Sequence, residues 1–199
     1  VRNPDAMMLL AKMKESGEHT LDRAFGVSIY MITFGRFLHL PREQLDLLGM
    51  LGMLQDVGKL RLPDTKEALG DDGLTMCDGH VGHSVSILKE TAGIPAQLPA
   101  LAALHHERCD GSGYPSGLKG VEIGLFGSIA GVIDTFDAIT NPRAGGEVMS
   151  PSNALSTLYK LRDIKFDGPL IEQFIQCVGV FPVGAIVELN SGEIGIVIA

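Results

Sequence analysis

Two adjacent histidines, His105 and His106, are the side chains of this sequence best suited to chemistry. They follow an apolar stretch of helical character and precede a glycine-rich loop at residues 110–120. Neighbouring residues on a helix point about 100° apart, so two such imidazoles do not easily bind one metal ion, whereas they can bind two ions side by side. A histidine pair can equally be a solvated helix end, so the other ligand types in the chain must decide.

Further side chains that bind metals stand at predicted helix ends or on inward faces. Asp134 is the most informative of them, because it lies in an otherwise apolar run at residues 129–134 and a buried carboxylate needs a partner. A mixed set of imidazoles and carboxylates suits iron, manganese, zinc or similar ions, which polarise phosphoryl oxygens and activate water near neutral pH. The candidate ligands are Glu15, His19, Asp56, His80, His105, His106 and Asp134.

Helices are the elements that must position these groups. Apolar residues recur with helical spacing through most of the chain, and prolines stand where several helices would begin. The predicted helices cover residues 4–16, 19–38, 42–55, 75–90, 95–106, 125–140, 151–161 and 169–178. Residues 57–73 contain glycines and a proline and predict an irregular connection.

The tail of the sequence changes character. Residues 185–189 and 193–199 are rich in β-branched side chains and flank Asn190-Ser191-Gly192, a pattern typical of a β-hairpin. The sequence therefore predicts an all-α domain over residues 1–180 and a small β appendage over residues 181–199. The chain begins at Val1 without an initiator methionine, so we expect a further domain upstream.

Composition narrows the class of protein. A chain of 199 residues with 45% hydrophobic residues and a mean hydropathy of +0.22 is long and apolar enough for one well-buried core. The net charge of −8 argues against a nucleic-acid polymer as partner, which would need a basic surface. Charges or glycines interrupt the apolar runs, so we expect no membrane span. Three unpatterned cysteines suit a reducing, cytoplasmic location.

The glycine-rich loop completes a longer motif. Residues 105–115 read HHERCDGSGYP and match the pattern HHExxDGxGYP, so the chain resembles an HD-GYP domain, the helical branch of the HD phosphohydrolase superfamily. Residues 134–138 are similar to that family's DxxDA, residues 15–19 to its ExxxH, His80 to its lone histidine and Lys59 to the lysine of its HDxGK. The resemblance implies an HD-domain bundle of about seven to eight helices with a small C-terminal β-hairpin.

The resemblance also implies an activity, namely metal-dependent phosphodiester hydrolysis of cyclic di-GMP in bacterial signalling. It implies about two or three divalent metal ions, iron or manganese first and zinc, nickel or magnesium as alternatives. Asp56 and Lys59 would be catalytic. The implied metal ligands are Glu15, His19, Gln55, Asp56, His80, His105, His106 and Asp134. The implied substrate contacts are Lys59, Arg108, Asp110, Gly113, Tyr114, Pro115 and Arg143.

Three departures from the family pattern bear on activity. The HD pair reads Gln55-Asp56, and an amide oxygen is a weaker ligand for a transition metal than an imidazole. Ser128 stands where an arginine is expected, and the segment beginning at Arg143 lacks the expected tyrosine and lysine. A second hypothesis is therefore a degenerate module that binds cyclic di-GMP, or docks a diguanylate cyclase domain or another signalling protein, without cleavage.

The loop that carries Tyr114 has its own expectation. Glycines at several of its positions leave few backbone constraints, and Tyr114 has no apolar neighbours in a periodic pattern. We expect residues 110–120 to be exposed and mobile in the absence of ligand.

Overall fold

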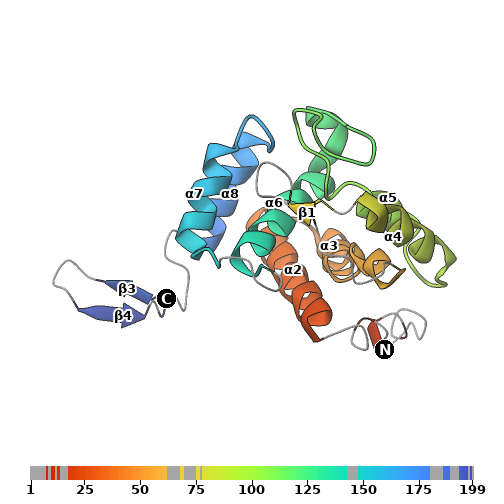
Figure 1. The fold of residues 1–199 in the computed structure, drawn as a ribbon, viewed down its shortest axis with the longest axis horizontal. Coiled ribbons are helices and arrows are strands. Elements are labelled where there is room, and N and C mark those ends of the chain that lie inside the picture. Colours follow the sequence, from red (N-terminus) through yellow and green to blue (C-terminus); the bar gives the residue numbers. More distant parts are fainter. Residues whose placement is uncertain are drawn as a thin grey trace.

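The computed structural model describes residues 8, 10, 11, 13, 18–61, 68–69, 75–76, 78–142, 148–179, 186–188, 193–196 and 198. Helices dominate it, as Figure 1 shows, and the predicted all-α fold is confirmed. In the described residues the α-helices are α2 (Glu18–Phe37), α3 (Arg42–Leu54), α4 (Asp78–Glu90), α5 (Leu98–Ala102), α6 (Gly124–Thr140), α7 (Pro151–Lys160) and α8 (Gly168–Val178).

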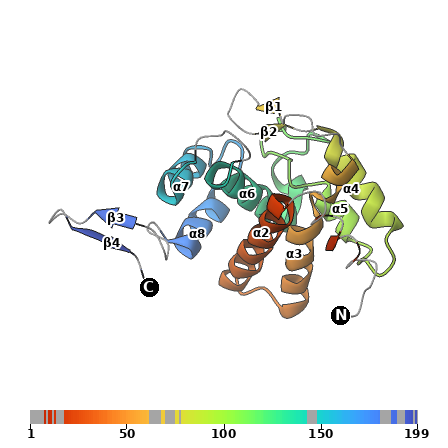
Figure 2. The same cartoon turned by 60° about the horizontal axis from the view of Figure 1, so that its bottom comes forward.

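Short elements complete the described part of the chain. Two 3-10 helices, η1 (Val57–Arg61) and η2 (Gly120–Ile123), stand after α3 and before α6. Strands β1 (Ala68–Leu69) and β2 (Thr75–Met76) form one antiparallel pair. Strands β3 (Ile186–Glu188) and β4 (Ile194–Ile196) form a second, which confirms the predicted hairpin at the C-terminal end. Figure 2 shows this hairpin beyond α7 and α8, away from the other helices.

Local sequence explains where the last two helices begin. Ser150 accepts a hydrogen bond from the backbone N–H of Asn153, and a proline follows it at the first position of α7. Asp167 accepts one from the backbone N–H of Leu170 at 2.8 Å at the start of α8. Such side-chain caps satisfy N–H groups that have no partner inside the helix, so both starts are fixed by single residues.

Helices α2 and α3 pack side by side (Figure 2), and a glycine sets how closely they approach. A Cβ at Gly52 would lie 2.6 Å from the Cα of Ser28, a distance at which one backbone must move. Because α3 ends at Leu54, this close packing brings Gln55 and Asp56 next to the first half of α2, where Arg23 lies. The pair thus delivers three polar side chains to one place.

Helix α6 runs through the centre of the bundle and packs against α2, α3, α5, α7 and α8. Phe136 on this helix makes edge-to-face contacts with Tyr30 and Phe174, at ring-centroid separations of 5.4 and 5.3 Å. Ile129 and Ile133 are fully buried with it. Residues Gly120–Thr140 are long and apolar enough, by length and composition, to cross a membrane. The expectation that charges or glycines interrupt every apolar run is therefore wrong for this run. However, 61% of its most apolar window is buried inside the bundle.

The structure corrects the prediction for the helix that should end in the histidine pair. That helix, α5, ends at Ala102, and residues 103–106 form turns instead. Helix α4 also begins three residues later than the predicted range, at Asp78. Because His105 and His106 lie in a turn, the 100° separation of a regular helix does not govern where their rings point.

Candidate metal centre

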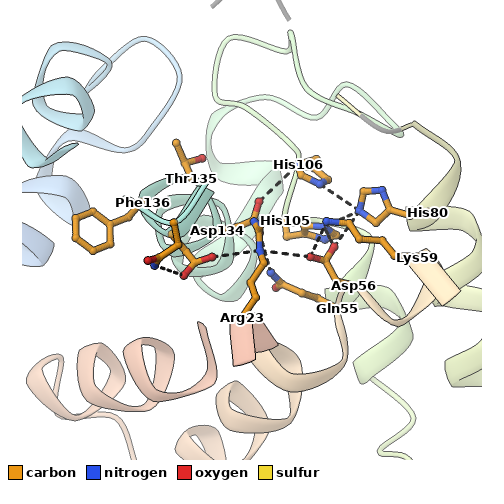
Figure 3. A network of polar contacts seen from close by, with 12 residues as sticks. Arg23, Gln55, Asp56, Lys59, His80, His105, His106, Asp134, Thr135 and Phe136 are labelled. Carbon is orange, nitrogen blue, oxygen red and sulfur yellow. Dashed lines mark hydrogen bonds and ion pairs between the residues drawn. The ribbon is translucent and has the colours of Figure 1, made fainter. Parts of the chain in front are cut away.

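Four side chains from three parts of the chain converge on one point. Asp56 follows α3, His80 lies on α4, and His105 and His106 lie in the turn after α5. One ligand atom from each lies within 4.8 Å of the others. The Nε2 of His80 is 3.2 Å from the Nε2 of His105 and 3.2 Å from that of His106, and 3.1 Å from Asp56 Oδ1 (Figure 3). Both rings of the pair therefore serve the same point, contrary to the helical argument.

A divalent metal ion between these four atoms explains their positions better than direct hydrogen bonds among them do. A single proton on His80 Nε2 can point toward only one of the three atoms around it, and Asp56 Oδ1 is buried without a hydrogen-bond partner among the described residues. Ligands held about 2.0–2.1 Å from a metal ion lie about 3.0–3.4 Å from one another. The separations of 3.1 and 3.2 Å around His80 fall in that range. We call these four residues the imidazole half of the site.

Neighbouring groups orient the imidazole half. The Nδ1 of His105 lies 2.7 Å from the carbonyl oxygen of Ala102, and donation from Nδ1 leaves the lone pair of Nε2 facing the site. Lys59 donates from Nζ to Asp56 Oδ2 at 2.9 Å, which turns Oδ1 of the same carboxylate toward the histidines. The ligand atoms are thus held in the forms that bind a metal, a neutral imidazole and a carboxylate.

Electrostatics favour the same protonation states. Burial, and next the nearby His105, lower the pKa of His106 well below its ordinary value, so its ring is neutral. Burial alone would raise the pKa of Asp56. The Lys59 ammonium first, and next the adjacent His105 and His80, outweigh burial and hold that pKa well below its usual range.

A glycine brings Asp56 and His80 together. Gly58 lies in η1, which packs on α4, and its N–H donates to Ser84 Oγ at 2.8 Å. A Cβ on Gly58 would collide with the backbone of His80 and of Ser84. The two elements approach this closely because residue 58 has no side chain.

The other half of the site is built around Arg23 of α2. Its Nη2 donates to Asp134 Oδ1 at 2.9 Å, and its Nε lies 3.2 Å from Asp137 Oδ2 and 4.0 Å from Asp56 Oδ2. Gln55 donates from Nε2 to the same Asp134 oxygen at 3.5 Å. Figure 3 shows the guanidinium between α6 and Asp56. We call Arg23, Gln55, Asp134 and Asp137 the arginine half of the site.

Mutual attraction keeps the arginine half charged although it is buried. Burial alone would lower the pKa of Arg23, but Asp134, Asp56 and Asp137 together hold it above its ordinary value. Burial alone would raise the pKa of Asp134, but Arg23, followed by His106, holds it below its usual range. The pKa of Asp137 is raised, because there burial outweighs the attraction of Arg23.

The glycine-rich loop is tied to the histidine pair, which corrects the expectation of few constraints. Glu107 is buried and accepts hydrogen bonds from the backbone N–H groups of Ser116 and Leu118 at 2.7 and 2.9 Å. Tyr114 stacks on His106 with a ring-centroid separation of 4.7 Å and an interplanar angle of 22°. A Cβ at Gly113 would collide with the backbone of the histidine-pair turn, so the loop folds closely over it.

The family model for the HD domain matches residues 6–170 of the chain. This chain belongs to the HD domain family. The fold is also similar to that of a solved HDG"Y"P protein from Bdellovibrio bacteriovorus, with a TM-score of 0.64 and 14% identity over 86% of this chain and 61% of that chain. The resemblance to HD-GYP domains is confirmed.

Curated relatives of this HD domain include cyclic-dinucleotide phosphodiesterases. A cyclic di-GMP phosphodiesterase of Pseudomonas aeruginosa is 32% identical over 100% of this chain and 49% of its own length. The cyclic di-GMP phosphodiesterase response regulator RpfG of Xanthomonas campestris is 34% identical over 70% of this chain and 38% of its own. A 3'3'-cGAMP-specific phosphodiesterase of Vibrio cholerae is 28% identical over 83% of this chain and 32% of its own length. The chain spans about half or less of the length of these relatives.

The remaining predicted site residues of the HD domain fall into three groups. Arg108 is buried, donates to the carbonyl oxygens of His105 and Glu107, and lies over the ring of Phe166, so its contacts hold the histidine-pair turn. Asp110 is exposed and accepts from the backbone N–H of Ser112 at 2.9 Å. Pro115 is also exposed. The predicted residues outside the described part are Glu15, Arg143 and the side chain of His19.

Sequence reasoning missed Arg23, and Asp137 was noted only as part of a motif. Both contribute directly to the buried network of the HD domain. One sequence signal was available for Arg23: it lies four residues, about one helical turn, after His19 in the same predicted helix. A cation on the face that carries an expected metal ligand is unusual, because two positive charges would compete for the same carboxylates.

Proposed function

We propose that this HD domain is a metal-dependent phosphodiesterase that hydrolyses cyclic di-GMP. The observation that carries the proposal is the convergence of Asp56, His80, His105 and His106 on one point, with a lysine beside it. A divalent metal ion held by these four residues would supply Lewis-acid stabilisation of a phosphoryl oxygen and an activated water. Iron and manganese suit this mixture of imidazoles and a carboxylate, with zinc as an alternative.

The residues of the chain contribute orientation and charge. Asp56 is held by Lys59 and faces the three imidazoles, so it arrives with its ligand oxygen already aimed. Lys59 lies beside the imidazole half, with Nζ 2.9 Å from Asp56 Oδ2, and its ammonium would neutralise a non-bridging phosphate oxygen of the substrate. Because His80, His105 and His106 are buried, both interactions would be stronger there than in water.

Tyr114 supplies the contact for a base or ribose. One face of its ring lies on His106, and the exposed loop around it is held by Glu107. Stacking of a nucleobase on an aromatic ring is worth about 1–3 kcal/mol per base. We infer that the loop carries a guanine near the imidazole half, so that the phosphodiester reaches the metal-binding point.

The test is hydrolysis of cyclic di-GMP by the chain after removal of metals and reloading with Mn²⁺. We expect turnover in the loaded protein, none after chelation, and none in a His105→Ala variant. His83→Ala is the matched control, because His83 lies on α4 three residues after His80 and outside the four-residue cluster. It should keep wild-type activity.

A second candidate, a module that binds cyclic di-GMP without cleaving it, gives a different result in the same assay. Retained binding with no product at saturating Mn²⁺ would replace the phosphodiesterase proposal by that one. Cleavage of 3'3'-cGAMP in preference to cyclic di-GMP would overturn the choice of substrate, and the product mixture would distinguish linear dinucleotide from GMP.

The division of the chain is also our proposal. We infer a helical domain over residues 1–180, an appendage over residues 181–199 and a further domain upstream, in a cytoplasmic protein. A partner such as a diguanylate cyclase domain would meet the exposed side of the Tyr114 loop.

A further inference from the structure

The arginine half of the site faces its carboxylates with hydrogen-bond donors. Arg23 donates to Asp134 at 2.9 Å and its Nε approaches Asp137 at 3.2 Å, while Gln55 presents its Nε2 to Asp134 at 3.5 Å. A metal ion needs lone pairs directed at it, and N–H groups cannot provide them. The described hydrogen bonds of this half therefore join donors of Arg23 and Gln55 to Asp134, while Gln55 Oε1 and Asp137 Oδ2 are buried without a hydrogen-bond partner among the described residues.

The imidazole half differs from the arginine half in how many ligand atoms converge on one point. Three imidazole nitrogens and one carboxylate oxygen point at one another there within 4.8 Å. Asp134 lies outside that group, and its Oδ2 is 3.9 Å from His106 Nδ1. Asp134 thus has its strong partner in Arg23 and only a long contact to the imidazole half.

Charge points the same way. Among the described residues, three carboxylates, Asp56, Asp134 and Asp137, face two cations, Arg23 and Lys59. One divalent ion more than balances that set, and a second would place a large excess of positive charge in a buried site.

We propose that Arg23 is a built-in cation that takes the place of a second metal ion, so that the chain holds one divalent ion, in its imidazole half. Asp134 then acts as the partner of Arg23 and not as a metal ligand. Gln55 fits this role because its amide N–H joins the guanidinium in facing the Asp134 carboxylate. This replaces the expectation of two or three ions.

This proposal extends the proposed function. It rests on that function only for its consequence for catalysis. A guanidinium presents its N–H groups to phosphoryl oxygens and cannot dissociate from the chain, so activity would follow the loading of a single ion. The number of bound ions is measured independently of any hydrolysis. Failure of one proposal is thus distinguishable from failure of the other.

The experiment counts Mn²⁺ in the full chain after chelation, reloading with excess Mn²⁺ and gel filtration. We expect about one ion per chain in the wild type and in Gln55→His, and about two in the double variant Arg23→Ala/Gln55→His, which removes the guanidinium and restores an imidazole. Arg61→Ala is the matched control, since Arg61 pairs with Glu90 on the surface, and it should keep one ion. Electron paramagnetic resonance of the wild type should show an isolated Mn²⁺ ion without exchange coupling to a second.

Two ions in the wild type, or an exchange-coupled pair in its spectrum, would overturn the proposal. So would a folded double variant that still holds one ion. If the double variant does not fold, the wild-type count and spectrum decide the matter alone, and a second ion gained by Gln55→His with Arg23 in place would also contradict it.

Discussion

The imidazole half and the arginine half of the site share Asp56 but differ in what faces their carboxylates. In the imidazole half, three imidazole nitrogens and Asp56 Oδ1 converge on a common point. In the arginine half, a guanidinium and an amide present protons to Asp134 and Asp137. The first arrangement requires a cation from solution, whereas the second already contains one.

The difference shows that a buried acidic site can be neutralised from within the chain. An isolated buried carboxylate is unfavourable, and an arginine satisfies it as a metal ion does, with directed contacts and a positive charge. The arginine half should therefore be stable without metal, while the imidazole half should change on loading. The four predictions below test this comparison, beginning with the largest effect.

Replacing Arg23 by alanine should give the largest loss of stability. Breaking a buried ion pair by removing one partner costs about 3–5 kcal/mol, because Asp134 and Asp137 would be left buried without their cation. Chemical denaturation of the metal-free protein measures the change in unfolding free energy. The control Arg61→Ala removes an ion pair whose side chains are 43% and 63% exposed, and it should change the unfolding free energy little. Similar losses in the two variants would contradict the comparison.

Replacing His105 by alanine should remove most metal affinity. Binding free energies of about 10–16 kcal/mol shared by four ligands suggest a loss of about 100- to 1000-fold in affinity. Competitive titration of Mn²⁺ against a chelator measures it, with His83→Ala as the control that should bind normally. An unchanged affinity would mean that the imidazole half is not the metal centre.

Replacing Glu107 by glutamine tests whether the loop depends on a buried carboxylate. A glutamine keeps one acceptor for the two N–H groups of Ser116 and Leu118 and turns a donor toward the other. Losing one hydrogen bond to a charged group costs about 1.5–3 kcal/mol, so hydrogen exchange at one of these amides should speed up about 10- to 100-fold. Glu122→Gln, at an exposed turn with one such contact to Lys119, should leave residues 110–118 unchanged. Rapid exchange in the wild type would show that the loop is mobile after all.

Replacing Gln55 by histidine should give the smallest effect. A change in the shell around a bound metal usually alters affinity by about 10- to 100-fold, but here the new imidazole would meet Arg23 and not an ion, so we expect less than about threefold. The same chelator competition measures it. A large gain would show that residue 55 contacts the metal and would move the ion toward the arginine half.

Much of this site was predictable because it is carried by local patterns. Helical spacing placed α2, α3, α6, α7 and α8, and the HHExxDGxGYP run named the histidine pair. The rule that a buried carboxylate needs a partner was correct for Asp134. What sequence could not supply was the identity of that partner, because Arg23 and Asp134 are 111 residues apart and only the packing of α2 on α6 brings them together.

The turn after α5 explains why the prediction for the histidine pair differs from the structure. A helical reading of residues 95–106 separates neighbouring rings by 100°, and this argued for two metal ions. The actual helix α5 spans only Leu98–Ala102, and the backbone then turns so that His105 and His106 meet at His80. Element boundaries also depend on local side-chain hydrogen bonds such as that between His105 Nδ1 and the carbonyl of Ala102, which no pattern of apolar residues encodes.

The metal centre tolerates substitution of side chains that line it, but it does not tolerate a side chain at position 58. Side chains that line the site can be exchanged, as the Gln55-Asp56 pair illustrates, and the scaffold still brings Asp56 to His80. Any side chain at residue 58 would instead push η1 away from α4 and separate two ligands at once. On our proposal, a change at Gln55 or Asp134 would alter which cation this part of the site uses, whereas a side chain at residue 58 would separate Asp56 from His80.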